Sequence, residues 1–239
     1  MSERSSDSSP RPPKRAIVLL SGGLDSATAL ACAREDGFVC LALTVRYGQR
    51  HSFEIECARR VARTLGAAEH RVLELDLSSF GGSSLFPGGE VPRSGGDPSA
   101  RAEIPTTYVP ARNTVFLSLA LGWAEATGAD AIYLGVNALD YSGYPDCRPE
   151  YLRAFQALAD LATRRGVEGH PIVIVAPLLE LTKSQIIARG TALGVDYSLT
   201  TSCYDPDVVG KPCGSCDACV LRRRGFEGAG LRDPLEGIG

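Results

Sequence analysis

The segment Ser21-Gly22-Gly23-Leu24-Asp25-Ser26 has the residue types of a phosphate-binding loop. It follows an apolar run at residues 16–20 and precedes a stretch with helical spacing that continues to about Asp36. Glycines let a backbone approach an anion closely, and the N–H groups and dipole of a helix N-terminus attract negative charge. Open α/β sheets bind ligands at the carboxyl ends of their strands. We therefore expect this segment to bind nucleotide phosphates through Leu20, Ser21, Gly22, Gly23, Leu24, Asp25 and Ser26.

The charge of Asp25 restricts the kind of ligand that the loop can bind. A carboxylate repels a phosphate, so Asp25 makes chemical sense if Mg²⁺ lies between them, as in Mg-ATP. The sequence has neither the G-x-x-x-x-G-K-[ST] run of P-loop kinases nor a G-x-G-x-x-G after its first strand. The remaining alternative is an ordinary glycine-rich turn between a strand and a helix.

A second group of residues has the spacing of metal ligands. Three cysteines are each separated by two residues, and a fourth lies ten positions upstream: Cys203, Cys213, Cys216 and Cys219. Four thiolates suit tetrahedral Zn²⁺, and with every position filled by protein the zinc would be structural. An iron–sulfur cluster or four unligated thiols are the alternatives. Of the other cysteines, three lie in apolar surroundings and are expected in the core, whereas Cys147 lies in a polar loop and is a weak candidate for a nucleophile.

Alternating apolar runs and helical patterns must position these residues. Strands are expected at 16–20, 39–45, 72–77, 131–136 and 172–176, and helices at about 24–36, 53–65, 112–127, 150–165 and 183–193. This order predicts a Rossmann-like α/β fold, with five parallel strands and helices on both faces. Residues 78–111 interrupt it with many glycines and prolines, which indicates either a functional lid or, for residues 78–102, a variable surface excursion.

Composition narrows the class of protein. The chain has 239 residues, 44% of them hydrophobic, and a net charge of −3 with a pI of about 5.7. A partner such as tRNA or DNA would favour a basic excess, so we expect no direct nucleic-acid partner. No apolar run is long enough for a bilayer, and residues 1–15 read as a disordered tail without a secretory signal. We expect a cytoplasmic enzyme with an α/β domain at 16–197 and a zinc-binding region at 198–239.

The S-G-G-x-D-S loop after the first strand resembles the signature of the PP-loop ATP pyrophosphatases, whose fold is called adenine nucleotide alpha hydrolase-like. Members of that superfamily adenylate a carbonyl or carboxylate oxygen and hold the leaving pyrophosphate in the loop. Further motifs resemble the 7-cyano-7-deazaguanine synthase family over residues 16–234: 47–51, 108–113, 135–149, 182–184, 194–199 and the four cysteines. The departures are Arg46, where an acidic residue is expected, and Thr201, where a tryptophan is expected.

This resemblance implies a reaction and its participants. The family converts 7-carboxy-7-deazaguanine, ammonia and ATP into 7-cyano-7-deazaguanine, a queuosine precursor, through an adenylated acid and an adenylated amide. It implies one zinc ion per chain, free ammonia as the nitrogen source and a homodimer. The alternatives are transfer of the activated acyl group to another amine, tRNA thiolation, an amidating synthetase of the NAD or GMP type, and a non-catalytic zinc module.

Candidate roles follow from side-chain chemistry. Arg112 and Lys183 are expected to stabilise phosphate charge beside Asp25, and Lys183 is electrostatically misplaced at a helix N-terminus unless it has such a purpose. Its alternative is a solvated surface lysine. Donors and acceptors suited to a guanine-like edge and a carboxylate gather around one loop: Asn137, Asp140, Asp146 and Arg148. Tyr108 either stacks on the purine-like ring or belongs to the core.

Overall fold

Five parallel strands form the central sheet of the computed structural model, which describes residues 13–93, 103–137 and 144–236. They are β1 (Arg15–Leu19), β2 (Val39–Arg46), β3 (Glu69–Glu74), β4 (Ala131–Tyr133) and β5 (Val173–Val175), in the spatial order β3-β2-β1-β4-β5. Every neighbouring pair is parallel. The strand order changes direction at β1, where α/β sheets open a crevice for ligands. The predicted fold class is confirmed.

The side chains of the central strand β1 point alternately to the two faces of the sheet, and each face has its own hydrophobic core. Ala16 and Val18 of β1 belong to one buried cluster, and Ile17 between them belongs to the other. Successive side chains of a strand point to opposite faces, so a strand covered by helices on both sides must be apolar throughout.

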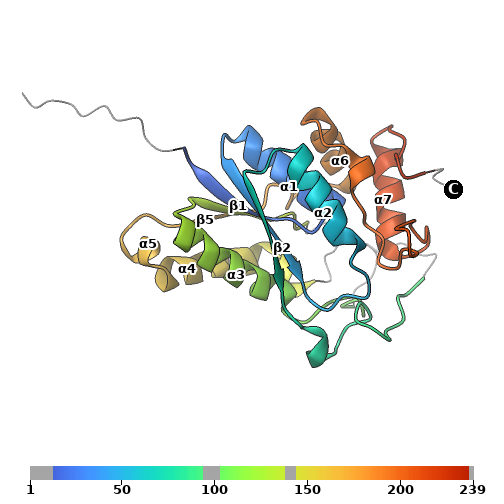
Figure 1. Ribbon diagram of the computed structural model, residues 1–239, viewed down its shortest axis with the longest axis horizontal. Helices are drawn as coiled ribbons and strands as arrows, with labels where there is room; N and C mark the ends of the chain where they lie inside the picture. Colours follow the sequence, from blue (N-terminus) through green and yellow to red (C-terminus); the bar gives the residue numbers. More distant parts are fainter. Residues whose placement is uncertain (1–12, 94–102, 138–143, 237–239) are drawn as a thin grey trace, which may run out of the picture.

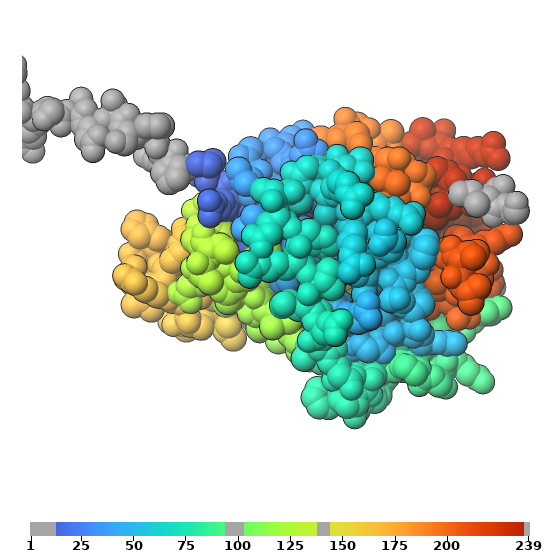
Figure 2. All heavy atoms as spheres, viewed as in Figure 1, coloured from blue at the N-terminus to red at the C-terminus, as the bar shows by residue number. Residues whose placement is uncertain are grey.

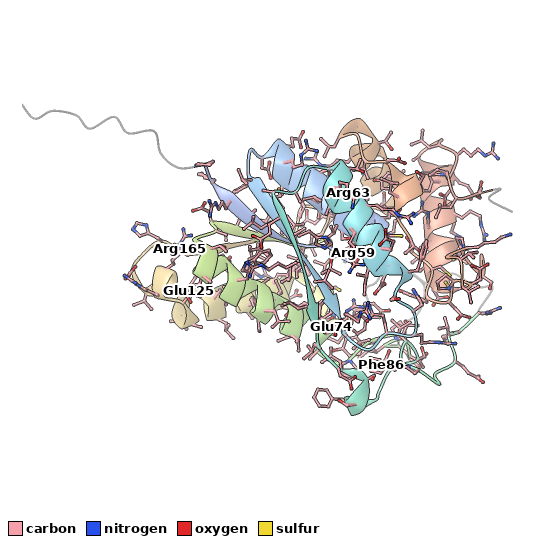
Figure 3. The ribbon with its side chains drawn as sticks, viewed as in Figure 1. Arg59, Arg63, Glu74, Phe86, Glu125 and Arg165 are labelled. Atoms are coloured by element: carbon pink, nitrogen blue, oxygen red, sulfur yellow. The ribbon has the colours of Figure 1, made fainter. Side chains whose placement is uncertain are left out.

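Helices cover both faces (Figure 1). One layer comprises α1 (Leu24–Glu35), α2 (Phe53–Thr64) and α6 (Lys183–Ala192), with α7 (Asp217–Gly228) packed against α6. The other comprises α3 (Arg112–Thr127) and α4 (Pro149–Ala162), followed by the short α5 (Arg164–Val167). In the described part of the chain, the connections include the 3₁₀ turns η1 (Ser78–Phe80), η3 (Pro145–Cys147) and η4 (Tyr197–Leu199). On α2, Arg59 and Arg63 point to solvent, as the helical spacing predicts (Figure 3).

Local sequence signals set several helix ends. Gly37 follows α1 with φ 84°, a left-handed conformation that glycine adopts without strain. Thr182 and Gln185 form a capping box at the start of α6: the Thr182 hydroxyl accepts the Gln185 N–H, and the Gln185 side chain accepts the Thr182 N–H. Both features were predicted from the sequence and are confirmed.

Some predicted boundaries are wrong. β3 begins at Glu69, not at residue 72, because this edge strand pairs with Leu41–Arg46 of β2 through largely exposed residues that give no apolar signal. The helix predicted over 150–165 breaks at Thr163, whose extended backbone (φ −111°, ψ 148°) ends α4 and whose hydroxyl caps α5. β4 and β5 have three residues each and are shorter than the apolar runs that contain them.

The described part of segment 78–111 is not a surface excursion. Leu85, Phe86, Val91 and Val109 are buried in the core on the α3 side of the sheet. Arg93 forms an ion pair of 2.8 Å with Asp205 from the C-terminal region, and Arg50 approaches the same carboxylate at 3.6 Å. Figure 2 shows the two segments, green and orange-red, on the same side of the molecule. Residues 94–102 of this segment lie outside the described part of the chain.

None of the helices in the described ranges is both long and apolar enough to cross a membrane. The predicted tail at 1–15 lies largely outside the described residues, which begin at residue 13.

Candidate active site

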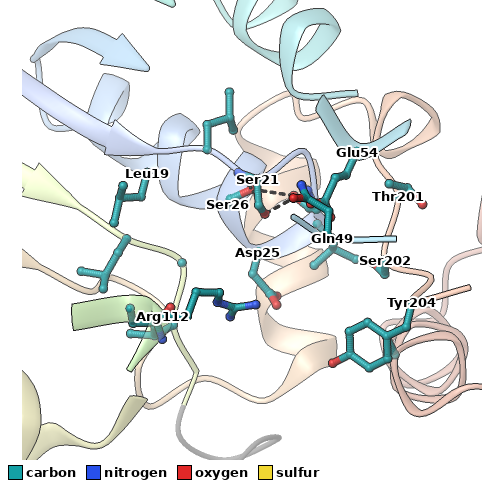
Figure 4. A pocket seen from close by; sticks show the side chains of 18 of the residues that line it. Leu19, Ser21, Asp25, Ser26, Gln49, Glu54, Arg112, Thr201, Ser202 and Tyr204 are labelled. Carbon is teal, nitrogen blue, oxygen red and sulfur yellow. Dashed lines mark hydrogen bonds between the residues drawn. The ribbon is translucent and has the colours of Figure 1, made fainter. Parts of the chain in front are cut away.

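A pocket of about 260 Å³ opens at the carboxyl edge of the sheet (Figure 4). Its walls come from the ends of β1, β2 and β4, the first turns of α1, α2, α3 and α6, and the segment 201–204 that leads to α7. Six of the seven residues predicted to bind phosphate line it, and the seventh, Gly22, is buried behind the loop. The residues predicted to bind phosphate therefore gather at one pocket, and their contacts with a nucleotide remain a prediction.

Close packing shapes the phosphate loop. The Ser26 hydroxyl donates to the Gly23 carbonyl at 3.0 Å and accepts the Ser21 N–H at 3.2 Å. Gly22 has φ 84°, and a side chain there would place its Cβ 2.1 Å from the Glu54 carbonyl oxygen of α2. The N-cap residue of α1 is Gly23, which has no side chain to cap the helix. The N-terminus of α1 therefore remains available to an anion in the pocket.

Lys183 and Asp25 form an ion pair beside this loop. Lys183 Nζ lies 2.8 and 2.9 Å from the two carboxylate oxygens of Asp25. Lys183 is only 8% exposed, so the interpretation as a solvated surface lysine is wrong. It is held by close contact with α7, where a Cβ on Gly225 would lie 2.4 Å from Lys183 Cγ. The pair places a cation and a potential Mg²⁺ ligand at the mouth of the loop.

Arg112 lines the pocket on the opposite side. It begins α3, and its guanidinium lies 5.8 Å from the ring centroid of Tyr47. Figure 4 shows its charged end directed toward Asp25. The rings of Phe116 and Tyr47 pack edge to face, with 5.6 Å between their centroids. They form an aromatic part of the pocket wall next to the Arg112 guanidinium. The three predicted charged residues, Asp25, Arg112 and Lys183, thus line one pocket.

The predicted substrate residues do not all reach this pocket. Asn137 lines it, and its amide donates hydrogen bonds to the carbonyls of Leu178 and Leu181. Tyr108, Asp146 and Arg148 lie outside the lining, and Asp140 lies outside the described residues. Their roles remain predictions.

Two of these residues have local structural roles. The Asp146 carboxylate accepts the Asn113 N–H at 3.0 Å in the first turn of α3, and burial raises the pKa of its carboxyl group. The Tyr108 hydroxyl accepts the Ala111 N–H at 2.9 Å.

Sequence reasoning assigned no role to Gln49 and Glu54, which the structure places in the pocket wall. Thr201, Ser202 and Tyr204 form another part of the wall beside the phosphate loop (Figure 4). The signal for Gln49 and Glu54 was their position just beyond the second strand, where a parallel sheet collects its ligand-binding residues.

Cys147 also lines the pocket, but its environment opposes a nucleophilic role. Burial raises the pKa of its thiol to about 12. The Asn113 amide lies 3.3 Å from its sulfur. A thiol that remains protonated at neutral pH is a poor nucleophile, so the structure gives no support to a sulfur-relay cysteine at this position.

The four clustered cysteines form a compact site next to the pocket. Their sulfurs all lie within 4.8 Å of one another. Tetrahedral coordination with Zn–S bonds of about 2.3 Å needs sulfurs about 3.8 Å apart, so the set fits one metal ion. Cys203 Sγ accepts the N–H groups of Cys213 and Asp205, and Cys213 Sγ accepts that of Cys216. Such donors stabilise thiolates.

The five-stranded sheet, with an S-G-G-x-D-S loop at the end of its central strand, defines the class: an α/β protein of the PP-loop nucleotide-binding superfamily. The model of the family described as "Queuosine biosynthesis protein QueC" matches residues 15–230, and the chain belongs to that family.

Similar proteins agree with this assignment, and a solved structure shares the fold. The chain is 62% identical over 225 residues to a 7-cyano-7-deazaguanine synthase of Anaeromyxobacter sp. (strain Fw109-5), covering 94% of this chain and 96% of that one. The relative of the same name from Desulfatibacillum aliphaticivorans is 58% identical, with coverage of 94% and 97%. A 4-thiouridine synthetase in complex with RNA and ATP has a similar fold, with a TM-score of 0.50 and 19% identity over 90% of this chain and 53% of that one.

Proposed function

We propose that this protein converts 7-carboxy-7-deazaguanine and ammonia into 7-cyano-7-deazaguanine, the nitrile, at the cost of two ATP. The observation that carries this proposal is the near full-length identity of about 60% to proteins named 7-cyano-7-deazaguanine synthase. The pocket supports it, because a phosphate loop, two cations and an aromatic wall meet there. The protein is therefore an ATP-dependent carbon–nitrogen ligase.

The first activation turns an unreactive carboxylate into an acylating agent. A carboxylate oxygen of the substrate attacks the α-phosphorus of ATP, and pyrophosphate leaves from the phosphate loop. Ammonia then attacks the acyl carbon of the adenylate, AMP leaves, and the primary amide is formed. The second activation adenylates the amide oxygen with another ATP. Loss of AMP and a proton from that intermediate gives the nitrile.

The charged residues of the pocket are proposed to interact with different parts of the nucleotide. The Ser21–Ser26 loop is proposed to bind the leaving pyrophosphate, and Asp25 to hold the Mg²⁺ that accompanies the nucleotide. Lys183 and Arg112 stabilise the negative charge that develops on the phosphates. The burial of Lys183 strengthens this interaction, because charges act more strongly where water is scarce.

Substrate recognition is proposed to come from the side chains around residues 137–148. Asn137 faces the pocket. Contacts of Asp140, Asp146, Arg148 and Tyr108 with the substrate are proposed from the resemblance to the family. The acid and the amide share the guanine-like edge, so one recognition site can serve both activations.

The cysteine cluster is proposed to hold one Zn²⁺ that organises the segment after residue 200. The protein sulfurs fill all four positions of a tetrahedral ion, so this zinc would be structural. Free ammonia as the nitrogen source and a homodimeric assembly are further proposals that rest on the family.

The decisive experiment incubates the purified protein with 7-carboxy-7-deazaguanine, ammonium and Mg-ATP, and analyses products by mass spectrometry. We expect the nitrile, AMP and pyrophosphate, with two AMP per nitrile. The synthetic amide should give the nitrile with ATP alone. ADP and phosphate as the only nucleotide products would contradict adenylation, and an inert amide would contradict the two-step route.

A further inference from the structure

Glu54 provides a carboxylate in the pocket that the roles above leave unused. It lies in the first turn of α2, is partly buried and lines the pocket. Its Oε1 accepts a hydrogen bond of 2.6 Å from Gln49 Nε2. The other end of that amide, Gln49 Oε1, accepts the Tyr47 N–H at 2.7 Å, directly after β2. The Tyr47 backbone thus orients the Gln49 amide, and the Gln49 amide orients the Glu54 carboxylate. Figure 4 labels Gln49 and Glu54 in the pocket.

No salt bridge engages Glu54 within the described ranges. Arg112 acts on it through attraction at longer range. The pocket lining of the described chain has one other carboxylate, Asp25, and Lys183 occupies both of its oxygens. Glu54 therefore offers a carboxylate oxygen to a ligand. Its negative charge has no role in binding the phosphates, which are themselves anions.

The environment also favours proton uptake. Burial raises the pKa of Glu54 to about 7, against the opposing effects of the Gln49 hydrogen bond and the Arg112 charge. A carboxyl group that titrates near neutral pH can both accept and release a proton at that pH.

A small cation is the ligand that this chemistry fits. The proposed reaction consumes ammonia, which exists at neutral pH mainly as ammonium. Ammonium is attracted to a carboxylate, but its nitrogen lone pair is protonated and cannot attack a carbonyl. The pocket therefore needs a group that attracts the cation and removes one proton from it.

We propose that Glu54, oriented by Gln49, binds ammonium and accepts its proton, and so forms the amine subsite of this pocket. The inference rests on the proposed function. One N–H bond of ammonium breaks and its proton moves to a carboxylate oxygen of Glu54. The freed lone pair forms a C–N bond with the acyl carbon of the adenylate. The C–O bond to AMP breaks with its electron pair on the AMP phosphate, and the nitrogen loses a second proton to water to give the neutral amide.

A comparison of the two activations distinguishes a role of Glu54 in ammonium binding from a general effect of Glu54 on the pocket. Amide formation needs ammonia, whereas conversion of the amide to the nitrile does not. Glu54→Gln keeps the size of the side chain and an acceptor for Gln49. We expect kcat/KM for ammonium in amide formation to fall about 100-fold, while nitrile formation from the synthetic amide stays within about twofold of wild type. Glu56→Gln is the matched control, because Glu56 lies in the same helix and is about half exposed (47%).

A second nucleophile tests proton removal itself. Hydroxylamine is a weaker base than ammonia and is neutral at pH 7, so it needs no general base. We expect Glu54→Gln to trap the acyl adenylate as the hydroxamate at close to the wild-type rate.

Equal losses in amide formation, nitrile formation and hydroxamate formation would overturn the inference, because Glu54 would then act on the nucleotide or on the fold. An unchanged ammonium dependence in Glu54→Gln would overturn it as well. Failure of the wild-type protein to convert either the acid or the amide would instead refute the proposed function, and the amine subsite with it.

Discussion

The ion pair between Lys183 and Asp25 joins two parts of the chain that are 158 residues apart. In the proposed mechanism, Lys183 interacts with the phosphates of the nucleotide and Asp25 with its Mg²⁺. The two charges neutralise each other, which lowers the cost of keeping a buried cation beside a partly buried anion.

Removal of the cation should therefore affect catalysis more than substrate binding. For Lys183→Met we expect kcat to fall about 100- to 1,000-fold in both activations, since a fixed charge beside the developing phosphate charge is lost. KM for the acid should change little. Pyrophosphate release measures both activations. The control Lys211→Met changes an exposed lysine and should behave as wild type. A loss confined to KM would place Lys183 in substrate binding.

Glu54 makes the stability of the fold depend on pH. Its pKa rises from 4.5 to about 7 on folding, so between these values the native state binds the proton more tightly than the unfolded state. The native state therefore loses stability as the pH rises through this range, and the loss is complete above pH 7.

Glu54→Gln cannot titrate and escapes this loss. Its melting temperature relative to wild type should increase by roughly 6–12 °C between pH 4.5 and pH 8, which corresponds to about 3 kcal/mol for a domain of this size. Differential scanning calorimetry at the two pH values measures it. Glu56→Gln should show no such trend, and a constant offset for Glu54→Gln would mean that the carboxyl is not perturbed.

At the scale of elements, α7 determines where the Lys183 side chain can lie. Gly225 has no side chain, and this lets α7 contact α6 at the start of that helix. Any Cβ at this position would also lie 2.8 Å from Ile187 Cδ1, so a substitution forces α6 and α7 apart or moves Lys183.

Gly225→Ala should consequently reduce activity without changing any residue of the pocket. We expect kcat to fall about tenfold or more and the melting temperature to fall by a few degrees. The matched control is Gly122→Ala in α3, where a Cβ meets nothing within 4 Å. That change should raise stability by about 0.5–1 kcal/mol through helix propensity. Thermal unfolding and pyrophosphate release compare the two, and equal behaviour would show that the α6–α7 contact is not needed.

Helices, strands and turns that a short stretch of sequence encodes could be predicted. Contacts between elements that are distant in the sequence could not. The loop at 21–26 follows an apolar strand and opens a helix, so its position at the sheet edge followed from the sequence alone. The capping box at Thr182 is also local. The burial of Lys183 depends on a glycine in α7, which no local pattern reveals. Asp146 was assigned to the substrate from its chemistry, yet its carboxylate bonds to the start of α3 through tertiary packing.

At the scale of the whole molecule, the cysteine cluster adjoins the pocket, because Cys203 belongs both to the cluster and to the pocket wall. Its neighbour Thr201 donates its N–H to the carbonyl of Gly22 in the phosphate loop at 3.0 Å. Two residues of backbone therefore connect the cysteine cluster to the phosphate loop.

Cys216→Ser should lose the metal and weaken nucleotide binding together. We expect metal content to fall from one per chain to near zero, the melting temperature to drop by more than about 5 °C, and the Kd for ATP to rise. Elemental analysis, thermal unfolding and calorimetric titration measure these quantities. Cys32→Ala removes a buried thiol outside the cluster and should keep the metal. Protein purified without chelators and free of zinc would refute the zinc assignment.

The sheet order has a consequence for synthesis on the ribosome. Residues from Leu19 to Arg222 line the same pocket, and its last wall comes from the segment after residue 200. β1, β2 and β3 are complete by residue 74 and can pair as soon as they emerge, since chains generally fold from the N-terminal side. The nascent chain therefore exposes an open phosphate loop for most of its translation. Nucleotide can enter a complete pocket only after the segment after residue 200 has left the exit tunnel, and the proposed metal binding by the cysteines of that segment belongs to the same late stage.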